Sequence, residues 1–418
     1  MFETMFQFAE APNLRHLRMV QVIGRVGGVS GAARELFTSQ PAVTQAMTKL
    51  EAEIGTPIFE RRATGTYPTV PGKQYLLRID RFFEILDKAI AHVVLGQQAE
   101  EPRVDRLVTG TQLRSFILTS EPGRLSEIAH SLGLSPSSVL RSARTLERTL
   151  GRPLFDRTAH GPIPNRAGEF LAREFRRAVR EIELARGEIQ LAAGAESLEL
   201  VVGALPMAGS YELAEATRRF MASHPYVKIR LVTGEYSKLL ADLSNSRVDM
   251  IFGMLRRPEW AGNVSEEVLL RDSYCMVARR GHPLTELDEV MPADLANYPW
   301  VVPSMGTPRR ARIEAIFDGM QPRPRFQLET SSLTMSRAML LSSDTITLMT
   351  RSEVQYDLDL GIMARLRCPY IDDLLIKGVT TRSDWLPTRA HTAFLDCLRE
   401  VTAQSQHDQG ERPGWCAR

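Results

Sequence analysis

Long apolar runs and CxxC pairs are missing from this sequence of 418 residues, and we expect no targeting segment. No stretch of eighteen consecutive apolar residues occurs, so we expect no membrane-spanning helix and no membrane partner. The first residues, MFETMFQFAEAPNLRH, lack the basic and apolar regions of a signal peptide, which favours a cytoplasmic location. The four cysteines, Cys275, Cys368, Cys397 and Cys416, lie far apart without a CxxC pair, which argues against a zinc site or a disulfide framework.

Motifs of catalysis are missing as well. The sequence contains no HExxH, no GxSxG, no Walker loop and no GxGxxG. The two clearest carboxylate pairs, Glu266–Glu267 and Asp372–Asp373, are adjacent in sequence and need not converge on one site. We therefore expect no enzymatic activity, no metal site and no cofactor.

The charge is distributed unevenly along the chain. The net charge is only +2, but residues 1–193 carry 26 Lys/Arg against 21 Asp/Glu. Residues 124–180 alone carry 11 basic and 5 acidic side chains. A basic excess of this kind favours contact with phosphate groups, although a solvated helical surface would give the same count.

A phrase of twelve residues occurs twice. LEAEIGTPIFER begins at Leu50, and LERTLGRPLFDR begins 96 positions later at Leu146. At the same offset, without a gap, further identical residues align from Ser30 with Ser126 to Gly72 with Gly168. A match this long indicates two copies of one structural unit.

Each copy predicts two short helices and a hairpin. Ser39 suits an N-cap and Pro41 suits the first turn of a helix that Gly55 ends. The preceding segment SGAARELF predicts another helix, and PIFERRATGTYPT predicts a strand, a glycine turn and a second strand. This is a helix-turn-helix followed by a wing. Amide, hydroxyl and basic groups on its outer face suit base edges and phosphates, and the candidates are Ser39, Gln40, Pro41, Thr44, Gln45, Thr48, Lys49, Arg61 and Arg62.

The segment AARELFTSQPAVTQAMTKLEAEIGTPIFERRATGTYPTVPGK resembles the winged helix-turn-helix of LysR-type transcriptional regulators. The resemblance implies that Ser39, Gln40, Pro41, Thr44 and Gln45 enter the major groove of double-stranded promoter DNA. The second copy departs from the pattern, because SQPAVTQ is replaced by SPSSVLR. Its candidates for DNA contact are Ser135, Ser137, Arg141, Arg144 and Arg157. With Leu140 on the same face, this copy either contacts guanine or phosphate, or packs against a partner.

A long helix with a coiled-coil seam follows each wing. Apolar residues recur at steps of four and three in both copies. In the second copy they are Leu171, Phe175, Ala178, Ile182, Ala185 and Ile189, and in the first Tyr75, Ile79, Phe82, Leu86, Ala89 and Val93. The LysR resemblance implies that such helices join two subunits, which predicts a homodimer or a higher oligomer. The alternative is that the two copies pack against each other within one chain.

From Leu198 onward, short apolar strands alternate with helices, which predicts parallel sheets with helices on both faces. Ligands bind such sheets beyond the carboxyl ends of the strands. The residues expected to bind an effector are Met207, Ala208, Gly209, Ser210, Thr233, Gly253, Met254, Ser304, Met305, Thr307, Ser331, Ser332, Met349 and Thr350. The region resembles the LysR effector domain, built from two lobes like a periplasmic binding protein. LETSSLTMSRAMLLSSDTITLMTRSEV resembles the galactose-binding-protein regulator branch, which implies a sugar or an aromatic acid as effector.

The predicted fold class is mixed: two tandem all-α winged helix-turn-helix units with long linker helices, followed by an α/β two-lobed effector domain. The expected boundaries are 12–95 and 107–193 for the two units, 197–402 for the effector domain, and 403–418 for a disordered tail. Lobe I spans about 197–275 and 375–402, and lobe II spans about 276–374. Together these features predict a metabolite-sensing transcriptional regulator that contacts RNA polymerase. The alternative is a ligand-binding or scaffold protein whose helix-turn-helix units no longer bind DNA.

Overall fold

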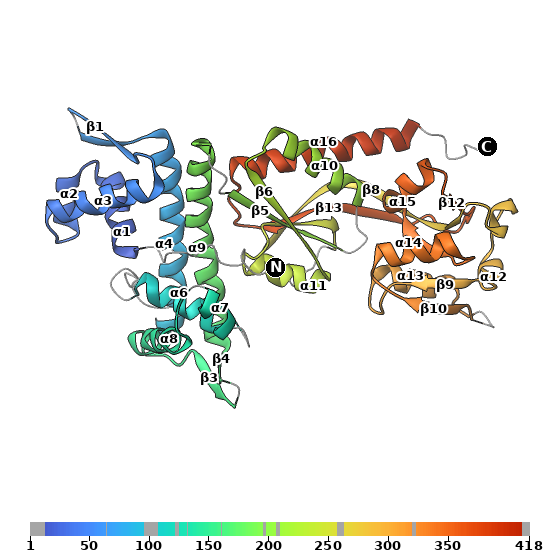
Figure 1. The fold of residues 1–418 in the computed structure, drawn as a ribbon, viewed down its shortest axis with the longest axis horizontal. Coiled ribbons are helices and arrows are strands. Elements are labelled where there is room, and N and C mark those ends of the chain that lie inside the picture. The colour runs from blue at the N-terminus through green and yellow to red at the C-terminus, as the bar shows by residue number, and fades with distance from the viewer. Residues whose placement is uncertain are drawn as a thin grey trace. The chain divides into compact units, whose positions relative to one another are not determined.

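The chain divides into two units, which are described separately in this computed structural model (Figure 1). The structure describes residues 13–63, 65–95, 108–121, 125–131, 133–159, 161–194, 198–205, 210–256, 263–319 and 323–411. Unit 1 is Met1–Glu199 with two short segments, Tyr226–Lys228 and Ser244–Arg247. Unit 2 comprises Leu200–Pro225, Ile229–Leu243 and Val248–Arg418.

Unit 1 contains one series of elements twice. The first copy has α1 (Leu14–Val26), α2 (Val29–Glu35), α3 (Gln40–Ile54), β1 (Phe59–Arg62), β2 (Gly65–Pro68) and α4 (Val70–Leu95). The second has α6 (Gly110–Thr119), α7 (Leu125–Ser131), α8 (Pro136–Leu150), β3 (Phe155–Thr158), β4 (Gly161–Pro164) and α9 (Arg166–Ala192). Every element of the second copy begins 96 residues after its counterpart, so the sequence repeat is a structural repeat.

The repeated phrase preserves the junction between a helix, α3 or α8, and the wing that follows it, β1–β2 or β3–β4. The Glu51 carboxylate on α3 accepts hydrogen bonds from the backbone amides of Ile58 and Phe59, at 2.8 and 3.1 Å. Glu147 on α8 accepts from the two equivalent amides at 2.7 and 3.1 Å. These bonds satisfy amides at the start of each wing strand and hold the hairpin against the helix. The repeat therefore preserves how the wing is mounted.

A glycine in each copy lies directly against the start of the wing. A Cβ atom on Gly72 would meet the carbonyl oxygen of Ile58 at 1.9 Å, and one on Gly168 would meet that of Leu154 at 2.1 Å. Backbone atoms in this position cannot move aside as a flexible side chain can. Both glycines are therefore required for the linker helix to start beside the wing.

We expect Gly72→Ala to destabilise unit 1 by about 1–3 kcal/mol, the usual range for overpacking. The matched control is Gly28→Ala, because Gly28 has an extended φ of 178° and a methyl group added there would meet no atom within 4 Å. Urea denaturation followed by circular dichroism measures both changes. Equal stability of the two variants would contradict the close approach between α4 and the wing.

Helices α4 and α9 pack against each other within the chain and run antiparallel. Arg78 near the start of α4 bonds to Glu181 in the second half of α9, at 2.6 Å. His92 near the end of α4 stacks beside Phe170 at the start of α9, with ring centroids 4.6 Å apart. Later residues of α4 therefore contact earlier residues of α9, as an antiparallel arrangement requires. This places the two winged copies at opposite ends of the helix pair (Figure 1).

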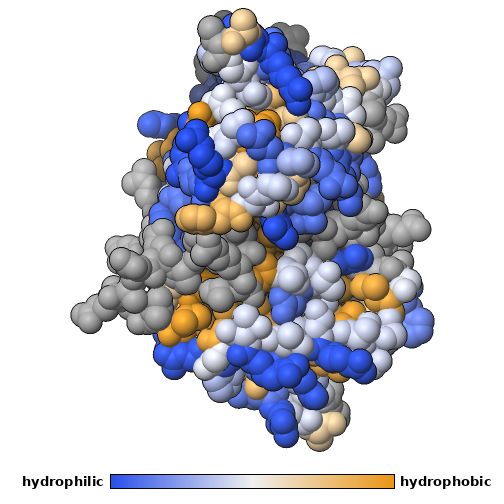
Figure 2. Space-filling model, turned by 90° about the vertical axis from the view of Figure 1, so that its left-hand side faces the viewer, coloured by the Kyte–Doolittle hydropathy of each residue, from blue (hydrophilic) through white to orange (hydrophobic). Residues whose placement is uncertain are grey.

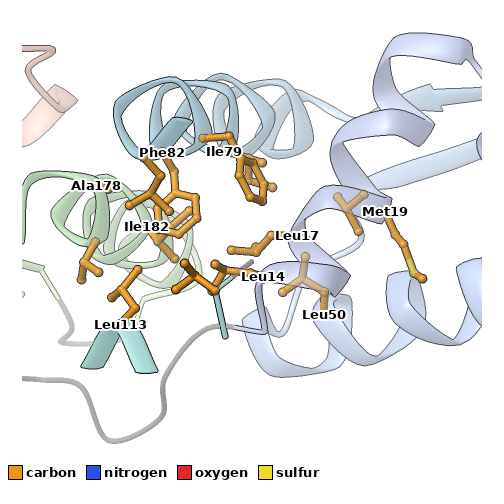
Figure 3. Packing of buried hydrophobic residues seen from close by; sticks show 14 of the residues in the cluster. Leu14, Leu17, Met19, Leu50, Ile79, Phe82, Leu113, Ala178 and Ile182 are labelled. Carbon is orange, nitrogen blue, oxygen red and sulfur yellow. The ribbon is translucent and has the colours of Figure 1, made fainter. Parts of the chain in front are cut away.

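The antiparallel pairing of α4 with α9 contradicts the prediction that the α9 seam joins two subunits. All six predicted dimerisation residues are buried in one core shared by both copies, and they are Leu171, Phe175, Ala178, Ile182, Ala185 and Ile189. Figure 3 shows Phe82 of α4 among the side chains of Ala178 and Ile182 of α9. The prediction that this seam joins two chains is wrong, because the copies bury it against each other. A single chain supplies both helices that the seam requires.

Unit 2 is built on a seven-stranded sheet and a small parallel pair. The sheet contains β5 (Leu198–Ala204), β6 (Val227–Thr233), β7 (Met250–Met254), β8 (Val264–Arg279), β11 (Thr347–Thr350), β12 (Met363–Arg365) and β13 (Leu374–Arg382). The pair is β9 (Pro299–Val302) with β10 (Arg325–Glu329). The helices are α10 (Ser210–Ser223), α11 (Tyr236–Ser244), α12 (Pro292–Leu295), α13 (Pro308–Ile316), α14 (Leu333–Ser342), α15 (Arg351–Asp359) and α16 (Arg389–Glu411), with a 3-10 turn at Pro283–Glu286.

The expectation of parallel sheets is confirmed only in part. β5 and β7 are parallel, but β13 pairs antiparallel with both β7 and β8, and β11 also pairs antiparallel with β8. The reason is that β8 and β13 are long strands that run side by side through most of the domain. The first half of β8, from Val264, is not predicted as strand because charged residues interrupt its apolar pattern. Helix α11 covers one face of the sheet, and α10 and α16 cover the other (Figure 1).

The expected tail is also shorter than predicted. Helix α16 continues through Glu411, so residues 403–411 are helical, and residues 412–418 lie outside the described residues. This stretch contains good helix formers such as Ala403, Gln404 and Glu411, and its first proline is Pro413. Polar composition alone therefore did not separate a solvated helix from a disordered tail.

Candidate functional site

The outer face of α3 presents the polar side chains predicted for the first copy. Ser39, Gln40, Pro41, Gln45, Thr48 and Lys49 are exposed, and Thr44 is half-buried. Val43, Met47 and Leu50 on the opposite face are buried in the core. The Ser39 hydroxyl accepts a hydrogen bond from the Ala42 amide at 3.4 Å, so Ser39 caps the helix that it begins. The helix thus offers amide, hydroxyl and ammonium groups to a partner surface.

The wing adds positive charge beside this helix. Arg61 and Arg62 are exposed on β1. Arg62 forms an ion pair with Glu60, and its guanidinium lies 5.4 Å from the centre of the Tyr67 ring. Both contacts keep the arginine near the hairpin, where it can reach a phosphate. Hydrophilic side chains are spread over the face shown in Figure 2, between smaller hydrophobic areas.

The second copy presents a different surface. Ser135 caps α8 by accepting from the Ser138 amide at 3.2 Å, and Ser137, Arg141 and Arg144 are exposed on that helix. Arg157 is exposed on β3. Leu140 is half-buried, so the reading face is less apolar than its sequence suggested.

One basic residue of α8 was missed by the sequence reasoning. Arg148 is exposed and donates to the Thr145 hydroxyl at 2.9 Å. Arg141, Arg144 and Arg148 share one helical face, a pattern that steps of three and four would have revealed. Helix α8 carries these three arginines and one glutamate, whereas α3 carries one lysine and two glutamates. The second copy therefore offers the more basic surface.

Unit 2 contains a cavity of about 340 Å³ at the carboxyl ends of strands. This volume suits a small metabolite. It is lined by Leu205, Glu235, Tyr236, Ser237, Met254, Arg256, Pro303, Ser304, Met305, Gly306, Thr307, Pro308, Arg309, Ser331, Thr350, Glu353 and Lys377. The N-termini of α11, α13 and α15 begin at this lining, and they direct backbone N–H groups toward an anion or a hydroxyl.

A buried lysine forms part of the cavity floor. Lys377 on β13 is fully buried and pairs with Asp272 of β8 at 2.6 Å. Lys377 also donates to the hydroxyls of Thr350 and Ser352, and the Ser352 hydroxyl donates to Asp272 at 2.7 Å. Burial alone would raise the pKa of Asp272, but the Lys377 charge and these hydrogen bonds hold that pKa below its ordinary value. The network fixes polar groups beneath the cavity.

A second buried pair stands at the cavity wall. Arg309 on α13 donates to both oxygens of Glu353 on α15, at 2.6 and 2.7 Å. Glu353 also accepts from the Thr350 amide at 2.8 Å and so caps α15. Burial would lower the pKa of Arg309, but the Glu353 carboxylate raises it above its ordinary value. The pair therefore orients Arg309 as a charged, fixed group of the wall.

Six predicted effector residues line the cavity, and they are Met254, Ser304, Met305, Thr307, Ser331 and Thr350. Thr233 is exposed at the end of β6, Gly253 lies within β7, and Ser332 caps α14. The prediction that Met349 binds an effector is wrong, because this side chain is fully buried with Cys275 and Val277 in a core cluster. Met207, Ala208, Gly209 and the side chain of Ser210 lie outside the described residues.

The charged lining was not predicted. Arg309, Glu353 and Lys377 were not predicted because they lie within α13, α15 and β13, and the prediction considered only turns after strands. Glu235 and Arg256 lie in such turns, after β6 and β7, and were also missed. A lysine within the apolar strand LLIKGVTT was the available signal, since an unpaired lysine is rarely buried. Among the described residues there is no helix long and apolar enough to span a membrane, and no cluster of side chains that could hold a metal ion.

Comparison with known proteins matches both units. The model of the LysR substrate-binding domain matches residues 193–403. The model of bacterial regulatory helix-turn-helix proteins of the lysR family matches twice, at residues 14–73 and 111–169. The transcriptional regulator GalR of Pseudomonas putida is 30% identical over 396 residues, which cover 94% of this chain and 98% of GalR. That alignment therefore extends across both winged copies.

Other similar proteins cover less of the chain. The regulator PcaQ of Agrobacterium fabrum is 27% identical over 303 residues, or 72% of this chain and 97% of PcaQ. Among solved structures, a full-length OxyR variant from Pseudomonas aeruginosa has a TM-score of 0.53 at 20% identity. It covers 70% of this chain and 95% of its own, and it supports the fold.

Proposed function

This chain belongs to the LysR family of DNA-binding transcriptional regulators, and on that basis we propose that its two winged copies read promoter DNA under the control of a metabolite bound in unit 2. The observation that carries the proposal is the duplicated exposed reading helix and basic wing, held on one shared core. In the first copy the proposed contacts are Ser39, Gln40, Pro41, Thr44, Gln45, Thr48, Lys49, Arg61 and Arg62. In the second they are Ser135, Ser137, Arg141, Arg144 and Arg157, with Arg148 added.

The proposed domains are 12–95, 107–193 and 197–402, the last with lobe I at about 197–275 and 375–402 and lobe II at about 276–374. The cavity at the strand ends supports an effector site made by Met254, Ser304, Met305, Thr307, Ser331 and Thr350 with the charged lining. Hydroxyl donors and a fixed Arg309 suit an oxygen-rich ligand, so the proposed effector is a sugar or an aromatic acid. Effector binding shifts the population of DNA-binding arrangements and thereby changes contact with RNA polymerase in the cytoplasm.

Two substitutions separate base reading from phosphate contact. We expect Gln45→Ala to cost about 1–3 kcal/mol of binding at one position of the operator and to relax specificity there. Arg61→Ala should weaken binding to all sequences and reduce the slope of log affinity against log salt by about 1. Fluorescence anisotropy on promoter and unrelated duplexes, at several salt concentrations, measures both. If Gln45→Ala lowered affinity equally for every duplex, the proposed base contact would be wrong.

The effector proposal is tested with galactose and benzoate as probes. A probe that binds the cavity should raise the Tm, because a ligand at a hundredfold excess over its Kd stabilises the folded protein by about 2.7 kcal/mol. Ser304→Leu, which places an apolar side chain in the cavity, should abolish the shift. Thr233→Val, at an exposed position away from the cavity lining, should leave it unchanged. A shift that persists in Ser304→Leu would locate the ligand elsewhere, and no shift with either probe would contradict the proposed ligand class.

A further inference from the structure

The interface between α4 and α9 contains a buried ionic contact. Arg78 has a side chain only 3% exposed, and it pairs with Glu181 at 2.6 Å and approaches Glu188 at 3.9 Å. Arg81 reaches the same Glu181 carboxylate at 3.2 Å. Both carboxylates belong to α9, and both arginines belong to α4. Positive charge from one copy therefore meets negative charge from the other.

The repeat shows which residues would face each other if two α4 helices, or two α9 helices, paired in the geometry of the α4–α9 pair. At the offset of 96, Glu181 corresponds to Ile85, and Arg78 corresponds to Glu174. Two α4 helices in the same geometry would place Arg78 beside Ile85 without a carboxylate. Two α9 helices would place Glu181 beside Glu174 and Arg177, the counterparts of Arg78 and Arg81, so one of its two cations would be replaced by a like charge, which is costly in a buried interface. The charges thus favour α4 with α9 over either matched pair.

Side-chain volumes in the interface also favour α4 with α9 over a pair of identical helices. Phe82 of α4 occupies the position of Ala178 in α9, and the two pack together in the shared core. Two α4 helices would oppose two phenylalanines, and two α9 helices would leave a cavity between two alanines. Bulk in one helix fills space left by the other. The two copies are therefore complementary and not interchangeable.

Because the two copies pack together through this complementary interface, unit 1 carries two different surfaces for DNA, one on α3 and one on α8. Helix α4 has 26 residues and is therefore about 39 Å long. Successive turns of the major groove are about 34 Å apart, so reading helices at opposite ends of such a pair can reach two of them. The first copy offers Gln40 and Gln45, which suit adenine, and the second offers Arg141 and Arg144, which suit guanine.

We propose that a single chain recognises a non-palindromic DNA segment of two unlike half-sites, one read by α3 and the other by α8. The inference rests on the proposed DNA-binding function. It differs from recognition by two identical units, which reads a palindrome. If chains also associate through another surface, the whole segment is repeated, and each repeat keeps its two unlike halves.

The test is selection of binding sequences from random duplexes with the full-length chain. We expect two conserved half-sites that differ in sequence, separated by about one helical turn. Gln45→Ala should randomise a position in one half only, and Arg144→Ala should do so in the other half only. Arg218→Ala, an exposed arginine of α10, should leave both halves unchanged.

Three results would overturn the inference. Two identical inverted halves would show symmetric pairing of like units, and a single conserved half would show that one copy does not read DNA. A loss of the same half in both Gln45→Ala and Arg144→Ala would also contradict it. If the wild-type chain selected no sequence and retained no DNA at low salt, the proposed function would fail together with the inference. Thermal melts of the two exposed-site variants distinguish lost contacts from lost folding.

Discussion

Replacing Glu181 by arginine should destabilise unit 1 by about 3–5 kcal/mol, the range for breaking a buried ion pair. The substitution places a third positive charge beside Arg78 and Arg81 in an interface that excludes most water. The same interface holds the seam side chains of both linker helices, so its loss exposes apolar surface. Urea unfolding followed through the helical signal measures the change, with the transition of unit 1 analysed separately because multidomain chains are not two-state.

Two variants make this result specific. The exchange Arg78→Glu with Glu181→Arg restores opposite charges and should recover a large part of the loss. Glu84→Arg, at an exposed position of α4 beside Lys88, should change stability by about 1 kcal/mol or less. If Glu181→Arg were no worse than Glu84→Arg, the packing of α4 against α9 within one chain would be contradicted.

Asp272→Asn should destabilise unit 2 by about 3–5 kcal/mol, because it leaves the fully buried Lys377 without its carboxylate partner. Asp372→Asn, at an exposed loop position, is the matched control and should be nearly neutral. Thermal melts measure both variants. Equal melting temperatures would show that Lys377 does not carry a charge that needs Asp272.

The same residue predicts a pH dependence. The pKa of Asp272 in the folded protein lies below its ordinary value of 3.8. Its carboxylate therefore stabilises the fold above that value, and this contribution is lost as the pH falls through the lower folded-state pKa. Wild-type stability should decrease on acidification more steeply than that of Asp272→Asn. Parallel profiles would contradict the assigned ionisation of the pair.

Local signals predicted the winged copies well. N-cap serines and the αL glycines Gly55 and Gly151 act over a few residues, so a single sequence contains them. The partner of the linker helices was not predictable in the same way. A heptad pattern indicates that a helix needs a partner helix. Its residues, such as Leu171 and Phe175, do not indicate whether that partner belongs to the same chain or to another subunit. The charges that decide it, Arg78 and Glu181, are 103 residues apart.

The ligand cavity was predicted only in part. The turns after strands were found because the βα pattern places strand ends at one edge, which gave Ser304, Thr307 and Ser331. Lys377 and Glu353 come from a long antiparallel strand and a helix that the parallel interpretation did not bring to this site. Met349 was assigned to the cavity because a strand end alone does not tell which face its side chain occupies. Sheet topology, which sequence patterns do not specify, decided these positions.

Hydroxyl-radical footprinting of the full-length chain on its promoter shows directly how many winged copies contact DNA. We expect two protected patches on one face of the duplex, about one helical turn apart. Arg141→Glu with Arg144→Glu should remove one patch, and Gln45→Glu with Lys49→Glu should remove the other. A single patch, or two patches that disappear together in both variants while the protein remains folded, would contradict DNA reading by both winged copies of one chain.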